Sequence, residues 1–386
     1  MNIMYLDFNP INSFYWAILI FILGIVFSLK IGLLVNLKYK YNLFLYFWHL
    51  LFCIFYFIFV LSNGGDAVNY FKWAINNERE FGLGTGFVVG FTSFFSNYLN
   101  FSFFDLFLLY NFFGYIGLLF FAASIDQAVQ GKLLRYKLLA VLLVLLPSVS
   151  FWTSAIGKDA IAFMAVGMAL WSSLNYRSRK ILLIFSIFIM LLVRPHIAFV
   201  LLISFIFSLI FNKNINFYTR IFLGLITSSA SVIIFPLIIN YVGLQDANDV
   251  SDVSAYIDQR QSYNADGGSS VDISSMSLPM QMLTYMYRPL PFEAHSIFAL
   301  LASFDNLLLI LLSLIGLFYI FKKNKPSVNS NRLFLWLYFY ISLIILATTT
   351  ANLGIAMRQK WMILPFLIFL LLSVIGNNEL KVEKKR

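Results

Sequence analysis

Eleven apolar runs, each close to the length that crosses a lipid bilayer, take up most of the 386 residues. A transmembrane helix needs about 20 mostly apolar residues. Only 11% of the residues are charged and 61% are hydrophobic, whereas a soluble domain carries about 25% charged residues. The sequence therefore predicts an all-α polytopic integral membrane protein, whose first apolar run is a retained span and not a cleaved signal peptide.

The predicted spans are 14–35, 43–62, 103–125, 138–155, 159–175, 181–195, 196–212, 221–242, 296–321, 333–352 and 360–376. A further aromatic stretch at 87–101 is short and contains polar residues, so we interpret it as a re-entrant or interfacial segment, with a twelfth span as the alternative. The expected organisation is one transmembrane domain, 1–386, with large outer loops at 63–102 and 243–295.

Basic residues gather in alternate connections between the predicted spans. These connections and the C-terminal tail hold 19 of the 27 Lys and Arg residues, and only Asp126, Glu379 and Glu383 among the 17 acids. Because Lys and Arg concentrate in cytoplasmic loops, the asymmetry places the N-terminus outside and the C-terminus inside when the number of spans is odd. The net charge of +10 is thus interpreted as a topology signal and not as a nucleic-acid surface.

The remaining basic residues fall on the predicted outer side, against this rule. They are Lys72, Arg79, Lys158, Arg194, Arg260, Arg288, Arg358 and Lys360. Ionisable groups at membrane depth are costly and tend to mark function. Arginine and lysine side chains facing a lipid–water boundary suit a lipid-linked phosphate or diphosphate, and a nearby carboxylate could take the proton of an attacking hydroxyl.

This pattern defines a candidate site on the outer face. The predicted diphosphate-binding residues are Lys158, Arg194, Arg288, Arg358 and Lys360; the candidate catalytic carboxylates are Asp66, Asp159 and Glu293; His196 and His295 are further candidates. No metal and no other cofactor is expected, because the cations supply the positive charge.

Each residue also has a structural interpretation. Lys158 and Asp159 could form a local ion pair or cap a helix, and Arg194 could extend to lipid headgroups. Asp66, after two glycines, could be a turn residue or N-cap. Likewise, Arg358 and Lys360 could be an ordinary interfacial pair, Asp105 and Asp305 could cap or pair, and the histidines could be structural, with His49 at the interface.

The long polar loop at 245–277 contains six Asp and one Arg. It is interpreted either as a solvated loop or as a lid over a sugar groove. In the second interpretation Tyr256, Tyr263, Tyr285 and Tyr287 provide stacking surfaces for sugars.

The sequence lacks the motifs of several other enzyme classes. No Walker A loop, HExxH, CxxC or GxSxG motif occurs, so nothing indicates ATP hydrolysis, a zinc protease or a serine hydrolase.

Four stretches resemble bacterial oligosaccharide repeat-unit polymerases, the Wzy-type O-antigen, capsule and exopolysaccharide polymerases. They are the outer GGD sequence at 64–66, PSVSFWTSAIGKDA at 147–160, VRPH at 193–196 and MRQKWMILPF at 357–366. The resemblance implies a GT-C-like enzyme of the bacterial inner membrane, with many spans and a large outer loop, that joins undecaprenyl-diphosphate-linked repeat units at the outer face; the apolar runs themselves give 11 to 12 transmembrane helices. It also implies that Arg194, Arg288 and Arg358 contact the diphosphate and puts Asp66 forward as the base. Its members usually keep both termini in the cytoplasm, which an eleven-span topology does not.

The implied partners are undecaprenyl-diphosphate-linked oligosaccharide and membrane lipids, with flippase and chain-length regulator proteins as further candidates and no nucleic acid. Three alternatives stay open: an O-antigen ligase-like or lipid-linked-sugar GT-C glycosyltransferase, a polysaccharide transporter or flippase, and a non-enzymatic scaffold. The transporter is the less favoured, because the cytoplasmic halves of the predicted spans carry almost no charge.

Overall fold

The computed structural model describes residues 10–212 and 269–376, apart from His295, with isolated residues between 215 and 261. It is 79% helical, and the described residues form no β-strand. The chain divides into two compact units, Met1–Gln130 with Lys137–Arg194, and Gly131–Tyr136 with Pro195–Arg386.

Among the residues that the structure describes, six helices are long and apolar enough to cross a membrane, or seven if the bent pair Leu353–Met362 and Leu364–Val374 counts as one span. The six candidate spans are Tyr15–Gly32, Tyr39–Asn63, Phe103–Val129, Leu134–Trp152, Ala299–Phe321 and Arg332–Thr349. The protein is therefore an all-α, multi-pass membrane protein. The expected spans 159–175 and 196–212 correspond to helices of 16 residues, and most of 221–242 lies outside the described residues.

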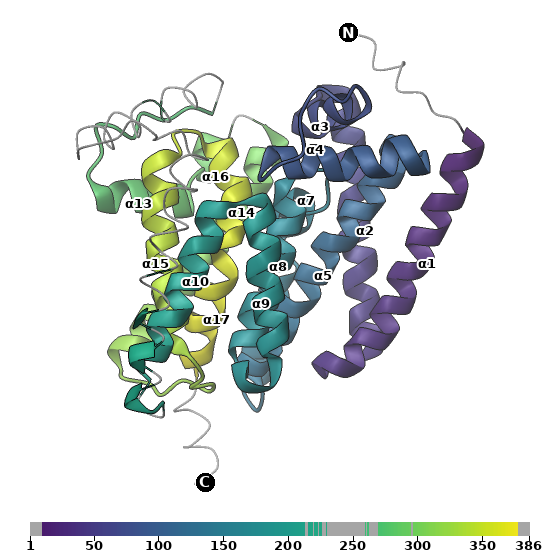
Figure 1. Cartoon of the computed structure of the whole chain (residues 1–386). Helices are drawn as coiled ribbons and strands as arrows, with labels where there is room; N and C mark the ends of the chain where they lie inside the picture. The colour runs from purple at the N-terminus through teal and green to yellow at the C-terminus, as the bar shows by residue number, and fades with distance from the viewer. Residues whose placement is uncertain are drawn as a thin grey trace. The chain divides into compact units, whose positions relative to one another are not determined.

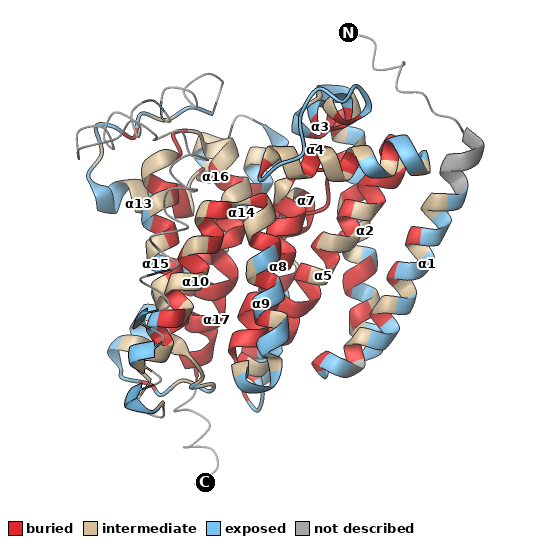
Figure 2. Cartoon of the chain, viewed as in Figure 1, coloured by how far each residue is buried: buried red, intermediate tan, exposed pale blue. Residues whose placement is uncertain are grey.

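The first unit is built around α5 (Phe103–Val129) and α8 (Lys158–Ser173). These two helices pack against each other, and α8 also packs against α9 (Tyr176–Val193). Figure 2 shows α5 and α8 almost entirely buried, whereas the outer helix α1 (Pro10–Val35) is largely exposed. An exposed apolar helix at the edge of a membrane protein is one that faces lipid.

Two glycines let α5 and α8 approach closely. A Cβ atom on Gly167 would meet the carbonyl oxygen of Gly117, and a Cβ on Gly117 would meet the backbone of Phe163 and Met164. Small residues at such contacts are the usual means of packing helices inside a membrane.

The remaining elements of the first unit are α2 (Tyr39–Asn63), α3 (Asp66–Ile75), α4 (Thr85–Ser93), the π-helical turn η2 (Phe94–Tyr98), α7 (Pro147–Trp152) and, from Lys137 on, α6 (Leu134–Val144). The stretch expected to be re-entrant or interfacial is thus α4 and η2, which are nine and five residues long. Figure 1 shows α4 crosswise to the long axes of α2 and α5. Each helix is shorter than the length that a span needs.

The second unit contains α10 (Pro195–Ile210), α13 (Leu278–Tyr287), the 3-10 turn η3 (Pro291–Glu293), α14 (Ile297–Phe321), α15 (Arg332–Thr349), α16 (Leu353–Gln359), the 3-10 turn η4 (Lys360–Met362) and α17 (Leu364–Val374). α17 is entirely buried and packs against α14 and α15. Lys132 fastens the end of α17: its Nζ donates hydrogen bonds to the carbonyl oxygens of Leu372 (2.6 Å), Ser373 (3.0 Å) and Ile375 (2.8 Å).

Candidate functional site

Two helix starts and one helix end meet on one side of the first unit. Gly64 and Gly65 have φ values of +73° and +128°, in the left-handed region that glycine tolerates, and they place Asp66 as the first residue of α3. Gly157 precedes Lys158, the first residue of α8. Tyr70 of α3 lies beside Gly157, because a Cβ there would be 3.6 Å from the Tyr70 ring. The GGD and GKD sequences are thus neighbours in space.

Asp159 forms an ion pair with Arg194. The Nη2 atom of Arg194, at the end of α9, donates a 2.7 Å hydrogen bond to Oδ1 of Asp159, and the two side chains are only 13% and 8% exposed. The guanidinium of Arg194 is thus directed at a buried carboxylate. The pair connects the start of α8 to the end of α9.

Four other charged side chains interact electrostatically with Lys158. Its pKa is lowered to about 8, first by burial, then by the positive charge of Arg194, while Asp159 and Asp66 oppose the shift and Arg79 adds to it. Three cations and two carboxylates therefore share this end of the first unit. The excess positive charge in a partly buried setting favours an anionic ligand.

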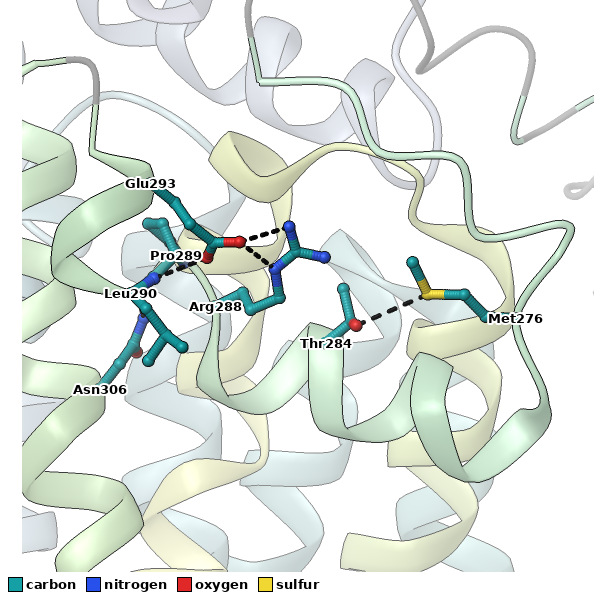
Figure 3. Close-up of polar contacts among 7 residues, drawn as sticks. All are labelled: Met276, Thr284, Arg288, Pro289, Leu290, Glu293 and Asn306. Carbon is teal, nitrogen blue, oxygen red and sulfur yellow. Dashed lines mark hydrogen bonds and ion pairs between the residues drawn. The ribbon is translucent and has the colours of Figure 1, made fainter.

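In the second unit, Arg288 is held by Glu293. The Nε atom of Arg288 donates a 2.8 Å hydrogen bond to Oε1 of Glu293, and the backbone N–H of Leu290 donates to Oε2 at 2.8 Å. Figure 3 shows the remaining terminal nitrogen of Arg288 pointing away from Glu293. Both oxygens of Glu293 are therefore engaged, while Arg288 keeps donor capacity for a further acceptor.

Lys360 is fully buried and not on a surface. Its Nζ contacts Oδ1 of Asn306 in α14, and Nδ2 of the same Asn306 donates a 2.9 Å hydrogen bond to the carbonyl oxygen of Pro289. This network ties α14 to the bend between α16 and α17 and to the residue after Arg288. The ammonium group of Lys360 is therefore engaged inside the second unit, whereas Arg358 is half-buried in the last turn of α16.

The other predicted residues fall as follows. His196 is half-buried in the first turn of α10, and His295, Tyr256 and Tyr263 lie outside the described residues. The expectation that Tyr285 is a stacking surface is wrong, because its side chain is buried. Tyr287 donates a 2.8 Å hydrogen bond to Ser313.

His49, which the sequence predicts to be interfacial, lies inside the first unit. The ring is fully buried, with Nδ1 2.6 Å from Oδ1 of Asn111 and Nε2 3.0 Å from Oγ1 of Thr153. Asp105, by contrast, is a helix cap as expected: its carboxylate accepts hydrogen bonds from the backbone N–H (2.8 Å) and hydroxyl (2.7 Å) of Ser102.

Arg79 and Lys132 make contacts that the sequence does not predict. Arg79 is one of the outer cations and stacks on Trp73, with its Cζ 4.3 Å from the ring centroid. Lys132 lies in a basic connection, where nothing in the sequence distinguishes it from the lysines that set topology. Among the described residues, no three His, Cys, Asp or Glu side chains gather closely enough to hold a metal ion.

No protein-family model, no curated protein and no solved structure matches the chain.

Proposed function

We propose that the protein is a glycosyltransferase-type polymerase that joins polyprenyl-diphosphate-linked oligosaccharide repeat units at the extracytoplasmic face of the bacterial inner membrane. The proposal includes a GT-C-like arrangement with eleven or twelve spans.

One observation carries the proposal: Lys158, Arg194 and Arg79 outnumber Asp66 and Asp159 at one end of the first unit, beside two glycine turns. In such a substrate the diphosphate gains negative charge as its bond to the sugar breaks. Nearby cations stabilise that charge. A lysine and arginines supply the positive charge without a metal ion.

The carboxylates have different capacities in this reaction. Asp159 accepts a 2.7 Å hydrogen bond from Arg194 and its side chain is only 8% exposed, so the carboxylate is already engaged and out of reach of a sugar hydroxyl. Asp66 is exposed at the start of α3, where an acceptor sugar can reach it. We therefore assign Asp66 as the base and Asp159 as the group that orients Arg194.

The reaction balances without a co-reactant. Asp66 takes the proton of the acceptor hydroxyl, the hydroxyl oxygen bonds to the anomeric carbon of the donor, and the bond from that carbon to the phosphate oxygen breaks. Polyprenyl diphosphate leaves with the electron pair, next to Lys158. Within the second unit, Glu293 accepts a 2.8 Å hydrogen bond from Nε of Arg288 and so orients that guanidinium.

Deletion of the gene, followed by gel analysis of the surface polysaccharide, tests the proposal. We expect long chains to disappear while single repeat units remain, and plasmid-borne wild-type protein, but not the Asp66→Asn variant, should restore them. Loss of capped cores with chain length unchanged would indicate a ligase instead. An unaltered polysaccharide would refute both functions.

A further inference from the structure

A hollow of about 580 Å³ opens in the outer segment that joins α2 to α5. Its walls come from α3, α4, η2 and the turn between α3 and α4. The aromatic lining residues are Trp73, Phe81, Phe87, Phe91, Phe94 and Tyr98. Ligand pockets generally enclose about 300–1,000 Å³, so the volume suits part of a small molecule or one lipid chain.

Several of these rings are open to the surroundings. Phe81, Phe94 and Tyr98 are 73%, 53% and 77% exposed, although the helices they belong to or adjoin are too short to be spans. Rings gathered around one hollow differ from scattered exposed apolar residues, which need no explanation. Their convergence indicates an apolar occupant.

Arg79 gives the hollow a charged edge. Its guanidinium stacks on Trp73 and forms no ion pair with any residue that the structure describes. The charge of Arg79 also acts on Lys158, so the hollow adjoins the cationic end of the first unit. A guanidinium braced by an aromatic ring retains donors for phosphate oxygens.

The lining argues against a sugar as the occupant. Sugars need several hydrogen-bonding partners, whereas the hollow has few polar groups beyond Arg79, Asn77 and Ser93. The hydroxyl of Ser93 already donates a 3.1 Å hydrogen bond to Oδ1 of Asn77. Phenylalanine rings instead suit a branched, unsaturated hydrocarbon chain.

We propose that this aromatic hollow binds the isoprenoid chain of a polyprenyl phosphate carrier, and that Arg79 contacts the phosphate at the end of that chain. The inference rests on the proposed function, in which the diphosphate of the same carrier lies next to Lys158. It adds a chain-binding site that lies outside the predicted spans.

The test uses full-length protein in phosphatidylcholine nanodiscs and undecaprenyl phosphate, without sugar, as the probe, with binding measured by native mass spectrometry. We expect wild type to bind it, and both the Phe81→Ser/Phe94→Ser double variant and Arg79→Gln to bind at least about tenfold more weakly. Phe321→Ser is the matched control: Phe321 is 81% exposed at the end of α14, and its loss should leave affinity within about twofold. All the altered side chains are exposed or outside the core, and size-exclusion profiles verify folding.

Three results would overturn the inference: wild type that does not bind the probe, a double variant that binds as wild type does, or equal binding of phosphatidylglycerol, which has the charge but not the isoprenoid chain. Failure of the polymerase function looks different. In that case deletion of the gene would leave the surface polysaccharide unchanged, and yet the purified protein would bind undecaprenyl phosphate through the aromatic hollow.

Discussion

Arg194 and Asp159 are 35 residues apart in the chain, and a 2.7 Å hydrogen bond joins their side chains at the point where α8 begins and α9 ends. The pair holds two helix ends together and orients a guanidinium beside Lys158. It therefore serves both the stability of the first unit and the charge of the proposed site.

Replacing Arg194 by Gln should destabilise the protein by about 3–5 kcal/mol, because a buried carboxylate loses its counter-charge. The double variant Asp159→Asn/Arg194→Gln should be less destabilised than the sum of the two single variants, since it leaves no unpaired charge. Unfolding in a detergent titration measures all three. Strict additivity would mean that the two side chains do not depend on each other.

Binding of the lipid diphosphate should depend on pH through Lys158. A lysine is charged below its pKa, and this one has a pKa of about 8, so the cation is lost as pH rises from 7 to 9. Affinity for undecaprenyl diphosphate should fall over that interval in wild type and stay level in Lys158→Arg, because arginine keeps its charge. Phosphate groups titrate near pH 6, below the interval. A parallel fall in both proteins would assign the effect to another group.

Lys132 should matter for stability and not for chemistry. Substitution by Met removes three hydrogen bonds to carbonyl oxygens at the end of α17 and should lower the free energy of unfolding by about 3 kcal/mol. The exposed Lys180 provides the control, since Lys180→Met should change stability by no more than about 0.5 kcal/mol. Equal effects of the two substitutions would exclude the capping role of Lys132.

A substitution that adds one methyl group tests how closely α5 and α8 pack. Gly167→Ala places a Cβ against the carbonyl oxygen of Gly117 and should cost about 1–3 kcal/mol, because well-packed backbones do not separate freely. Gly82→Ala adds the same group in open space and should be nearly neutral. Thermal unfolding of the two variants makes the comparison, and a tolerant Gly167 would show that the helices can move apart.

Hydropathy predicts where helices lie but not where they break. The expected span 103–125 corresponds to α5, with the Ser102–Asp105 cap at its start, because a long apolar run flanked by a capping pair has one favourable conformation in lipid. The run at 138–155, by contrast, is divided between α6 and α7 at Pro147. Proline cannot continue the hydrogen bonding of a helix interior.

Charge patterns identify candidate residues but not their partners. Asp159 lies next to Lys158 in sequence, yet its ion-pair partner Arg194 comes from the following helix, because the packing of α8 on α9 decides the contact. Arg358 and Lys360 have the same signature in the sequence, but only Lys360 is fully buried, since the bend between α16 and α17 turns it inward. The partner of a charged side chain and its burial depend on tertiary packing, which the residues next to it in the sequence do not determine.

The most direct test of the account is polymerisation by purified full-length protein supplied with undecaprenyl-diphosphate-linked repeat units from its own host. The account predicts a ladder of longer oligosaccharides in which each added unit releases one undecaprenyl diphosphate. It also predicts no ladder with Lys158→Met or Arg194→Gln, and none with Asp66→Asn, which should fold as wild type does. A wild-type protein that leaves the repeat units unjoined, or charge variants that join them at the wild-type rate, would contradict it.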